Sequence, residues 1–442
     1  MKMRIAYAGT ALAVAMFVAG ALGPFDPTDE TESAADTTSA GAEAGLLSQT
    51  GRPGSTEALQ DKVDGGEASA REMASLAFAY LQRSRDEAAP RHLVPARDLL
   101  EKSLEEEPKD NFPASLGMAA LGNATHDFTG SVEWSRRAIA IDPYNASSYG
   151  LLGDALFELG RYDEAADAYQ KMVDRRPDVA SYVRASYSAQ FRGRYNDALQ
   201  AMELAMDAAP PGGEQAAWLR HQLGDIYATL GRFQRSEREN RIGTQLAPGY
   251  VPPTVGIAES FIARDRLDEA LPIMRTAADE LPALEYLITL GDLFSATGDP
   301  ENAADTYSLA TEKLVEYRSA GVLPDSDFIL FYADHGLRLE SALAEGRSIY
   351  EDRPTSTTAD ALAWALYANE EPRAALRYSE IALAEANTPD ALLHFHRGMI
   401  ESALDNDEAA RAHLERAVEL DPAFSLVHRT TATDVLNERA SR

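Results

Sequence analysis

Beyond about residue 68, apolar residues recur at helical spacing in a unit of about 34 residues. Each unit predicts two helices joined by a short turn, and a proline closes most units. The closing prolines are Pro108, Pro143, Pro177, Pro210, Pro248, Pro282, Pro354 and Pro422. A single helix pair cannot bury its own apolar face, so the repetition predicts a stack of pairs that share one continuous core.

The clearest copy of the unit spans 146–178 and shows why its positions have fixed residue types. Gly153 on the first predicted helix and Ala165 on the second are small, which lets the two helices approach closely. Tyr169 is then expected to fill the space between them. Pro177 ends the second helix, because its ring cannot continue the hydrogen-bond ladder.

The turns of three consecutive units read Gly160-Arg161-Tyr162, Gly193-Arg194-Tyr195 and Gly231-Arg232-Phe233. With the small and aromatic positions around them, these units resemble the tetratricopeptide repeat. The resemblance covers most of the chain and implies an all-α, right-handed superhelical solenoid of about ten helix pairs. We divide the array into 69–318 and 319–442, the latter with a terminal helix, because the period is weakest between Glu312 and Phe328.

The N-terminal segment predicts an export signal. Lys2 and Arg4 precede an apolar run, and Ala19-Gly20-Ala21 fits a cleavage site. We therefore expect 1–23 to be a signal peptide or, if uncleaved, a membrane anchor. Residues 24–68 are rich in acidic and small residues, which predicts a flexible acidic linker. The expected location is periplasmic, extracellular or tethered to a membrane.

The charge balance narrows the range of partners. The chain has 41 basic and 71 acidic residues, a formal net charge of −30, and no cysteine. A surplus of this sign repels phosphate backbones, so we expect no nucleic-acid binding. The absence of cysteine excludes disulfides, thiolate catalysis and cysteine-ligated zinc.

No motif predicts catalysis. The sequence has no glycine-rich phosphate loop ending in Lys-Ser/Thr, no Gly-x-Ser-x-Gly and no His-Glu-x-x-His. His394 and His396 are two residues apart on a predicted helix and therefore face different directions. We predict no catalytic, cofactor-binding or metal-binding residue, and no cofactor.

The resemblance implies that the first helices line a concave groove, where solenoid proteins commonly bind their partners. The groove position is the residue that follows the small residue of each first helix. In successive units it is occupied by Asp154, Tyr187, Asp225, Glu259, Asp292, Phe331, Trp364 and Met399. Arg184, Trp218 and His221 are neighbouring candidates. This order predicts a groove that is first acidic and then apolar, suited to a protein or peptide with a basic stretch and apolar anchors.

Two alternatives remain for these residues, namely that the carboxylates reflect the general acidity of the chain and that Trp364 and Met399 pack between helices. The leading functional prediction is a non-catalytic scaffold or adaptor in the cell envelope or outside the cell. The second is a structural accessory subunit of an envelope enzyme or transporter complex. A solenoid hydrolase with paired carboxylates is the third.

Overall fold

The structure, a computed structural model, describes residues 55–440. This part of the chain forms 22 α-helices and one short 3-10 helix, and it contains no strand. The predicted signal segment 1–23 and the linker up to residue 54 lie outside the described residues. No helix within 55–440 is both long and apolar enough to cross a bilayer.

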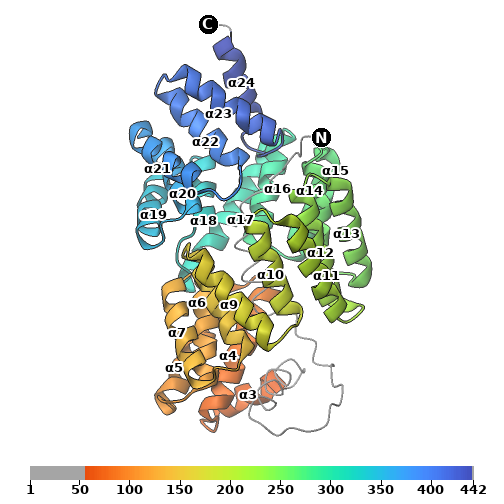
Figure 1. Ribbon diagram of the computed structural model, residues 1–442, viewed down its shortest axis with the longest axis vertical. Coiled ribbons are helices and arrows are strands. Elements are labelled where there is room, and N and C mark those ends of the chain that lie inside the picture. The colour runs from red at the N-terminus through yellow and green to blue at the C-terminus, as the bar shows by residue number, and fades with distance from the viewer. Residues whose placement is uncertain (1–54, 441–442) are drawn as a thin grey trace.

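Ten antiparallel helix pairs follow one another along the chain and form a superhelical solenoid, which confirms the predicted fold (Figure 1). The pairs are α4 (Ala70–Asp86) with α5 (Leu93–Glu106), α6 (Phe112–Ala124) with α7 (Phe128–Ile141), α8 (Ala146–Glu158) with α9 (Tyr162–Arg175), α10 (Val179–Phe191) with α11 (Tyr195–Ala208), α12 (Gly213–Thr229) with α13 (Phe233–Leu246), α14 (Pro252–Ile262) with α15 (Leu267–Glu280), α16 (Leu284–Ala296) with α17 (Pro300–Ser319), α18 (Ser326–Asp334) with α19 (Leu339–Asp352), α20 (Ser356–Ala368) with α21 (Pro372–Glu385), and α22 (Ala391–Ala403) with α23 (Asp407–Leu420). The helix α24 (Arg429–Ala440) follows the last pair.

The prediction of a flexible linker up to residue 68 is wrong for its last part, because α3 (Ser55–Asp64) is a helix. Leu59 and Val63 are one turn apart and pack against the core of the first pairs. The Tyr80 hydroxyl on α4 donates a hydrogen bond to Gln60 Oε1 at 2.7 Å. Two apolar residues at helical spacing are enough to dock a short helix, although the average composition of the segment is polar.

The small residues of the first helices bring each pair together as expected. A Cβ added at Gly153 would lie 2.4 Å from Tyr169 Cε1, and one added at Gly291 would lie 2.4 Å from Tyr307 Cε1. These distances are far below van der Waals contact, so the close approach depends on glycine.

We predict that Gly291→Ala lowers the free energy of unfolding by about 1–3 kcal/mol, because the new methyl group must displace Tyr307. Tyr307 has little freedom to move, since its hydroxyl donates to Asp292 Oδ1 at 2.8 Å. Denaturant unfolding measures the effect. Gly212→Ala is the control, because nothing lies within 4 Å of a Cβ at that position. Equal losses in both variants would contradict the packing argument.

Each turn within a pair contains at least one residue in the left-handed backbone region, and several turns lack the glycine that favours it. Gly160, Gly231 and Gly298 have φ values of 73°, 68° and 83°, whereas Glu370 holds the same conformation at 62°. A residue with a Cβ pays roughly 1–2 kcal/mol for this geometry.

Replacing the exposed Glu370 with glycine should therefore stabilise the protein by about 0.5–1 kcal/mol after the greater entropy of glycine in the unfolded chain is subtracted. The reciprocal change, Gly298→Ala, should destabilise the protein by a similar amount. No atom lies within 4 Å of a Cβ at that position, so only the left-handed backbone conformation opposes the alanine. Thermal unfolding of both variants tests the pair, and shifts in the same direction would contradict the prediction.

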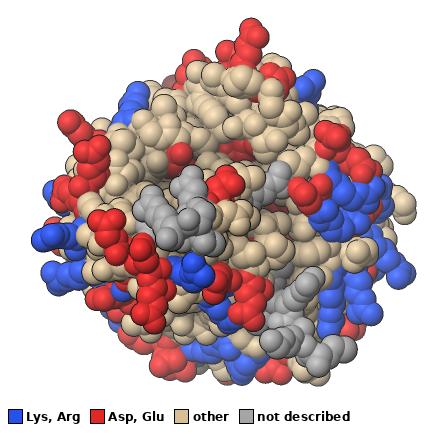
Figure 2. All heavy atoms as spheres, turned by 90° about the horizontal axis from the view of Figure 1, so that it is seen from above, with Lys and Arg blue, Asp and Glu red and all other residues tan. Residues whose placement is uncertain are grey.

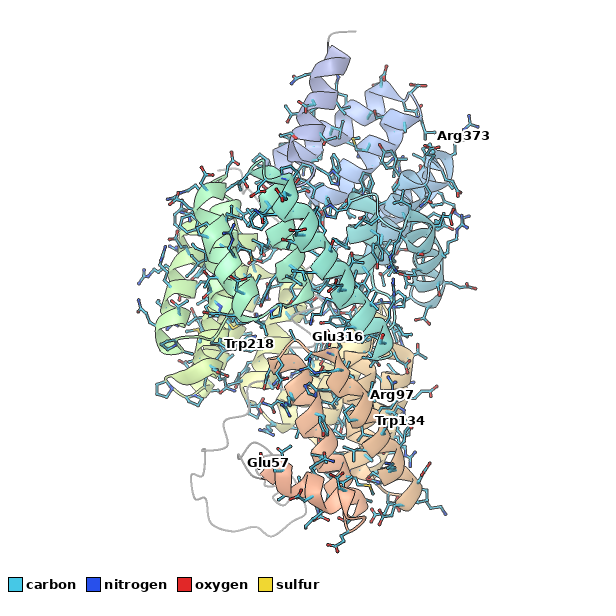
Figure 3. The ribbon with its side chains drawn as sticks, turned by 180° about the vertical axis from the view of Figure 1, so that it is seen from behind. Glu57, Arg97, Trp134, Trp218, Glu316 and Arg373 are labelled. Carbon is cyan, nitrogen blue, oxygen red and sulfur yellow. The ribbon has the colours of Figure 1, made fainter. Side chains whose placement is uncertain are left out.

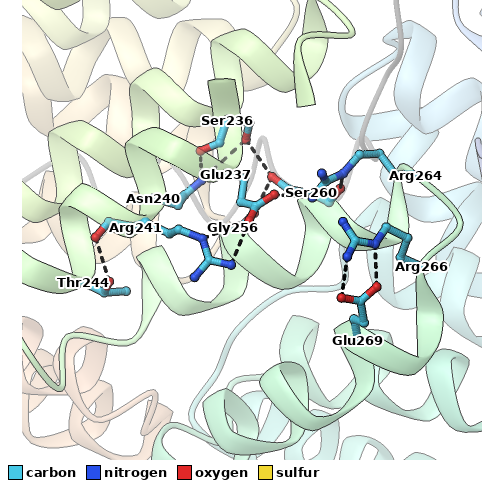
Figure 4. Close-up of polar contacts among 10 residues, drawn as sticks. All are labelled: Ser236, Glu237, Asn240, Arg241, Thr244, Gly256, Ser260, Arg264, Arg266 and Glu269. Atoms are coloured by element: carbon cyan, nitrogen blue, oxygen red, sulfur yellow. Dashed lines mark hydrogen bonds and ion pairs between the residues drawn. The ribbon is translucent and has the colours of Figure 1, made fainter. Parts of the chain in front are cut away.

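Between α12, α13 and α14, polar side chains occupy the space that Tyr169 and Tyr307 fill in their own pairs (Figure 4). We call these side chains the polar layer. Asn240 is fully buried, and its side chain lies where a Cβ at Gly224 or Gly256 would be. Its Nδ2 donates to the Ser236 carbonyl at 3.0 Å, and the Ser260 hydroxyl donates to Ser236 Oγ at 3.1 Å. The polar atoms of this layer pair with one another, which makes their burial tolerable.

The segment where the sequence period weakens differs in helix length. The second helix α17 has 20 residues and the following first helix α18 has only 9. One hydrophobic cluster nevertheless runs through this point, since it contains Leu314 from α17 and both Phe328 and Ile329 from α18.

The array closes on itself, so that the loop after α17 lies against the first pairs. The Leu323 amide donates to the Thr125 carbonyl at 2.9 Å, and Lys313 Nζ donates to the Ala88 carbonyl at 3.2 Å. Arg97 of α5 lies so close to Gly321 that a Cβ there would meet its guanidinium at 2.8 Å. In Figure 3, the end of α17 that carries Glu316 lies beside the helix that carries Arg97. We call this contact between 84–160 and 313–355 the seam.

Candidate functional site

Closure at the seam leaves a cavity of about 230 Å³ on the concave side of the solenoid. One wall comes from α8 to α12 and from α14, and the other comes from α18, α20 and the segment that leads into α22. The concave surface is therefore bounded on two sides, and the predicted concave groove is in part an enclosed space.

Five aromatic residues from α8 to α11 form one wall of the cavity. They are Phe157, Tyr162, Tyr187, Phe191 and Tyr195. The ring of Phe157 lies 4.8 Å from that of Tyr187 and 4.6 Å from that of Phe191, measured between centroids. The rings of Tyr162 and Phe191 are 4.3 Å apart. Rings in tilted and edge contact hold one another in place and present a rigid apolar surface.

Seven carboxylates and a single arginine are also found among the described residues that line the cavity. The acids are Glu158, Asp225, Glu259, Asp325, Asp327, Asp360 and Asp390. The arginine, Arg353, is 4% exposed, and its guanidinium donates to Asp325 Oδ1 at 2.5 Å. It also lies 3.7 Å from Glu158 Oε2 and 4.9 Å above the ring of Phe128. Arg353 thus joins the C-terminal half of the array to α7 and α8 across the seam.

Other acids of the cavity have partners of their own. Asp360 contacts Nδ1 of the buried His396 at 2.9 Å, and Asp390 Oδ1 accepts from the Leu392 amide at 2.8 Å. Burial raises the pKa of Asp390 to about 6. For His396, burial opposes the charged form, but the charge of Asp360 outweighs it and raises the pKa of the imidazole.

Three carboxylates of the cavity lack a strong cationic partner. Asp225 Oδ2 lies 3.5 Å from Gln222 Nε2 and 3.6 Å from His221 Nε2, whereas Glu259 and Asp327 form no ion pair or hydrogen bond of their side chains within the described residues. Burial is the main cause that raises the pKa of Asp225 to about 8. Burial and then the nearby Asp225 raise the pKa of Glu259 to about 8. Burial and the neighbouring acids also raise the pKa of Asp327.

Of the eleven residues predicted for the groove, the structure brings Tyr187, Asp225 and Glu259 together at the cavity. Their role in binding stays a prediction, but they share one accessible space. Figure 2 looks along the long axis and shows acidic side chains at the edge of the face seen from above and also near its centre.

Four other predicted residues are engaged in polar contacts inside the solenoid. Asp154 accepts two hydrogen bonds from Arg184, at 2.9 and 2.8 Å, and both residues are buried. His221 Nδ1 lies 2.9 Å from Asn240 Oδ1 in the polar layer. Asp292 contacts the Tyr307 hydroxyl and lies 3.2 Å from His335 Nε2. These contacts position neighbouring repeats.

The remaining four predicted residues belong to the core. Trp218 is 4% exposed in the cluster of α10 to α12, and Phe331 is 3% exposed. Trp364 is buried, and its Nε1 donates to Asp334 Oδ1 at 2.6 Å. Met399 packs against the same C-terminal cluster. The expected change from an acidic to an apolar groove is therefore not found as one continuous surface.

Several cavity residues were not predicted. Glu158, Asp325 and Arg353 lie in the turns or at the helix ends, whereas the sequence argument used only one position within each first helix. A signal was available for Arg353, because its unit carries an arginine directly before the closing Pro354 and an acid, Asp325, opens the same unit.

Among residues 55–440 no group of three or more histidine or acidic side chains has the geometry of a metal site.

Comparison with known proteins identifies the repeat. Models of the tetratricopeptide repeat match residues 136–180 and 391–424, so the chain contains tetratricopeptide repeats. These segments correspond to α8 with α9 and to α22 with α23.

One curated relative is anaphase-promoting complex subunit 7 of Arabidopsis thaliana, with 23% identity over 181 residues. The match covers 41% of this chain and 32% of the relative, so it spans about a third of that protein. Among solved structures, a chain of the APC/C hetero-tetramer Cut9–Hcn1 has 13% identity and a TM-score of 0.44, with 87% of this chain and 92% of that chain covered. Human IFIT1 in a dimer with m7Gppp-AAAA has 14% identity and a TM-score of 0.48, with 78% and 79% covered.

Proposed function

We propose that the chain is a non-catalytic scaffold that binds a protein or peptide partner on the concave side of its solenoid. The observation that carries this proposal is the stack of ten helix pairs, which contains tetratricopeptide repeats at 136–180 and 391–424 and leaves Tyr187, Asp225 and Glu259 facing a shared space. Repeat solenoids present extended surfaces of this kind for binding. The partner segment carries a basic stretch, to match the carboxylates, together with apolar anchors for the aromatic wall.

We further propose that the scaffold acts in the cell envelope or outside the cell, either exported or tethered through its N-terminal segment. The basic start and apolar run of 1–23 support this location. Fusing residues 1–68 to a reporter that is active only after export tests it. A reporter that stays inactive would contradict the location and leave the scaffold proposal standing.

The partner itself is sought by crosslinking in the native envelope, followed by binding measurements with the purified candidate. We expect a stable complex with the wild-type chain and weaker binding by the double variant Asp225→Asn/Glu259→Gln. The control Asp207→Asn removes an exposed carboxylate of α11 and should bind as the wild type does. Equal affinity of all three proteins would show that the concave carboxylates are not the binding surface.

A further inference from the structure

The aromatic wall and the unmatched acids of the cavity together point to a ligand of definite chemistry. Phe157, Tyr162, Tyr187, Phe191 and Tyr195 present ring faces and edges to the same space that Asp225, Glu259 and Asp327 line. Aromatic faces attract cations through the ring quadrupole, and carboxylates attract them through charge. A neutral apolar ligand would leave the acids without partners, which is costly in a buried site.

Two residues that line the cavity carry a buried polar atom with no hydrogen-bond partner within the described residues. The Tyr195 hydroxyl has no hydrogen-bond partner, and Tyr195 is 7% exposed. Asp325 Oδ2 likewise accepts no hydrogen bond, although Asp325 is 2% exposed, and its basic neighbour is the buried His126 Nδ1 at 3.5 Å. Buried polar groups are almost always paired, so unpaired ones at a cavity indicate a missing donor or acceptor.

Arg353 is the one cation among the described residues that line the cavity, and it already has partners. Arg353 is held by Asp325 and Glu158 and lies against Phe128, so its charge serves the seam. His221 is the other basic group near Asp225, and burial lowers the pKa of its imidazole, which keeps it neutral near pH 7. Neither group neutralises Glu259 or Asp327.

We propose that the cavity binds an organic cation, an alkylammonium or guanidinium group, which lies on the aromatic wall and pairs with Asp225 and Glu259. The size fits a small ligand, because sites for drug-sized molecules occupy about 300–1,000 Å³ and this one has about 230 Å³. The group comes either from a free amine or from a lysine or arginine side chain of a partner. The inference goes beyond the scaffold function, since a free amine binds whether or not a protein is recruited.

Proton release gives a supporting readout. Burial raises the pKa of Asp225 and of Glu259 to about 8, and Glu285 nearby also has a raised pKa because of burial. A bound cation favours the ionised carboxylates and so lowers these pKa values. Binding at pH 7 should therefore release protons, which calorimetry in buffers of different ionisation enthalpy detects.

The experiment is isothermal titration of the purified chain with putrescine, spermidine and agmatine, and in a second arm with short peptides that contain one arginine or one lysine. We expect saturable binding of at least one amine or basic peptide, and at least a tenfold loss of affinity in Asp225→Asn/Glu259→Gln. Phe191→Leu should also weaken binding by several-fold, because it removes one ring of the wall. Binding by the amines alone assigns the site to a free ligand, and binding by the peptides alone assigns it to a partner side chain.

Two controls separate this site from general charge attraction. The exposed-site variant Asp207→Asn should bind as the wild type does, and 1,4-butanediol, which has the length of putrescine without its charge, should not bind. Circular dichroism checks that each variant is folded. The proposal is overturned if no amine or basic peptide binds, if the double variant binds with unchanged affinity, or if Mg²⁺ at the same charge concentration competes as well as the amines.

Discussion

Replacing Arg353 with alanine is expected to lower the free energy of unfolding by about 3–5 kcal/mol, the usual cost of removing one partner from a buried ion pair. The guanidinium contacts Asp325, Glu158 and the ring of Phe128. Burial alone would raise the pKa of Asp325, yet the charge of Arg353 holds that pKa below its ordinary value. Without the arginine, a buried carboxylate remains with no adequate counter-charge.

Because Arg353 spans the seam, the variant should also loosen the closed solenoid. We expect a larger radius of gyration by small-angle scattering together with the loss of stability. Arg373→Ala on the exposed surface of α21 is the matched control and should change neither quantity measurably. In the double variant Arg353→Met/Asp325→Asn, part of the stability should return, because neither charge is left buried. An Arg353→Ala protein as stable and compact as the control would show that the seam does not depend on this residue.

The helix pairs could be predicted because the information that specifies them is local. Gly153 and Tyr169 lie within one unit, and their close contact follows from the period and from side-chain size. In three consecutive units the Gly-Arg-aromatic turns likewise mark where the first helix of a pair ends and the second begins. The helix α3 was missed because two apolar residues, Leu59 and Val63, outweigh a polar composition once a neighbouring core is available.

The cavity could not be predicted because it depends on closure of the whole array. His126 Nδ1 contacts the Leu323 carbonyl at 3.2 Å although the two residues are 197 positions apart. Whether such residues meet depends on small rotations that accumulate over several pairs, and no local pattern records them. Consequently the predicted groove position, the residue after the small residue of each first helix, has different surroundings from one unit to the next. Asp154 pairs with Arg184 inside the stack, whereas Asp225 faces the cavity.

The acids of the cavity should make the protein less stable as the pH rises from 6 to 8.5. Burial raises the folded-state pKa of Asp225 and of Glu259 to about 8, well above the ordinary values of 3.8 and 4.5. Between these limits the folded state holds more protons than the unfolded state, so each unit of pH costs stability. The stabilising effect is complete below about pH 4 and is lost as the pH rises through 8. The two groups together should account for a change on the order of 5 kcal/mol, since each contributes about 1.4 kcal/mol per pH unit over about two units.

Unfolding by denaturant at pH 6, 7, 8 and 8.5 measures this slope. The range stops at pH 6 because burial lowers the pKa of His126 and of His221, and such histidines destabilise the folded state once the pH falls below about 6.5. Asp225→Asn and Glu259→Gln should each flatten the slope and make the protein more stable than the wild type at pH 8.5, since neither variant buries a charge. Asp207→Asn should keep the wild-type slope, because that carboxyl is exposed. Parallel slopes in all four proteins would mean that the cavity acids carry no cost of ionisation, and that water or a bound cation already compensates their charge.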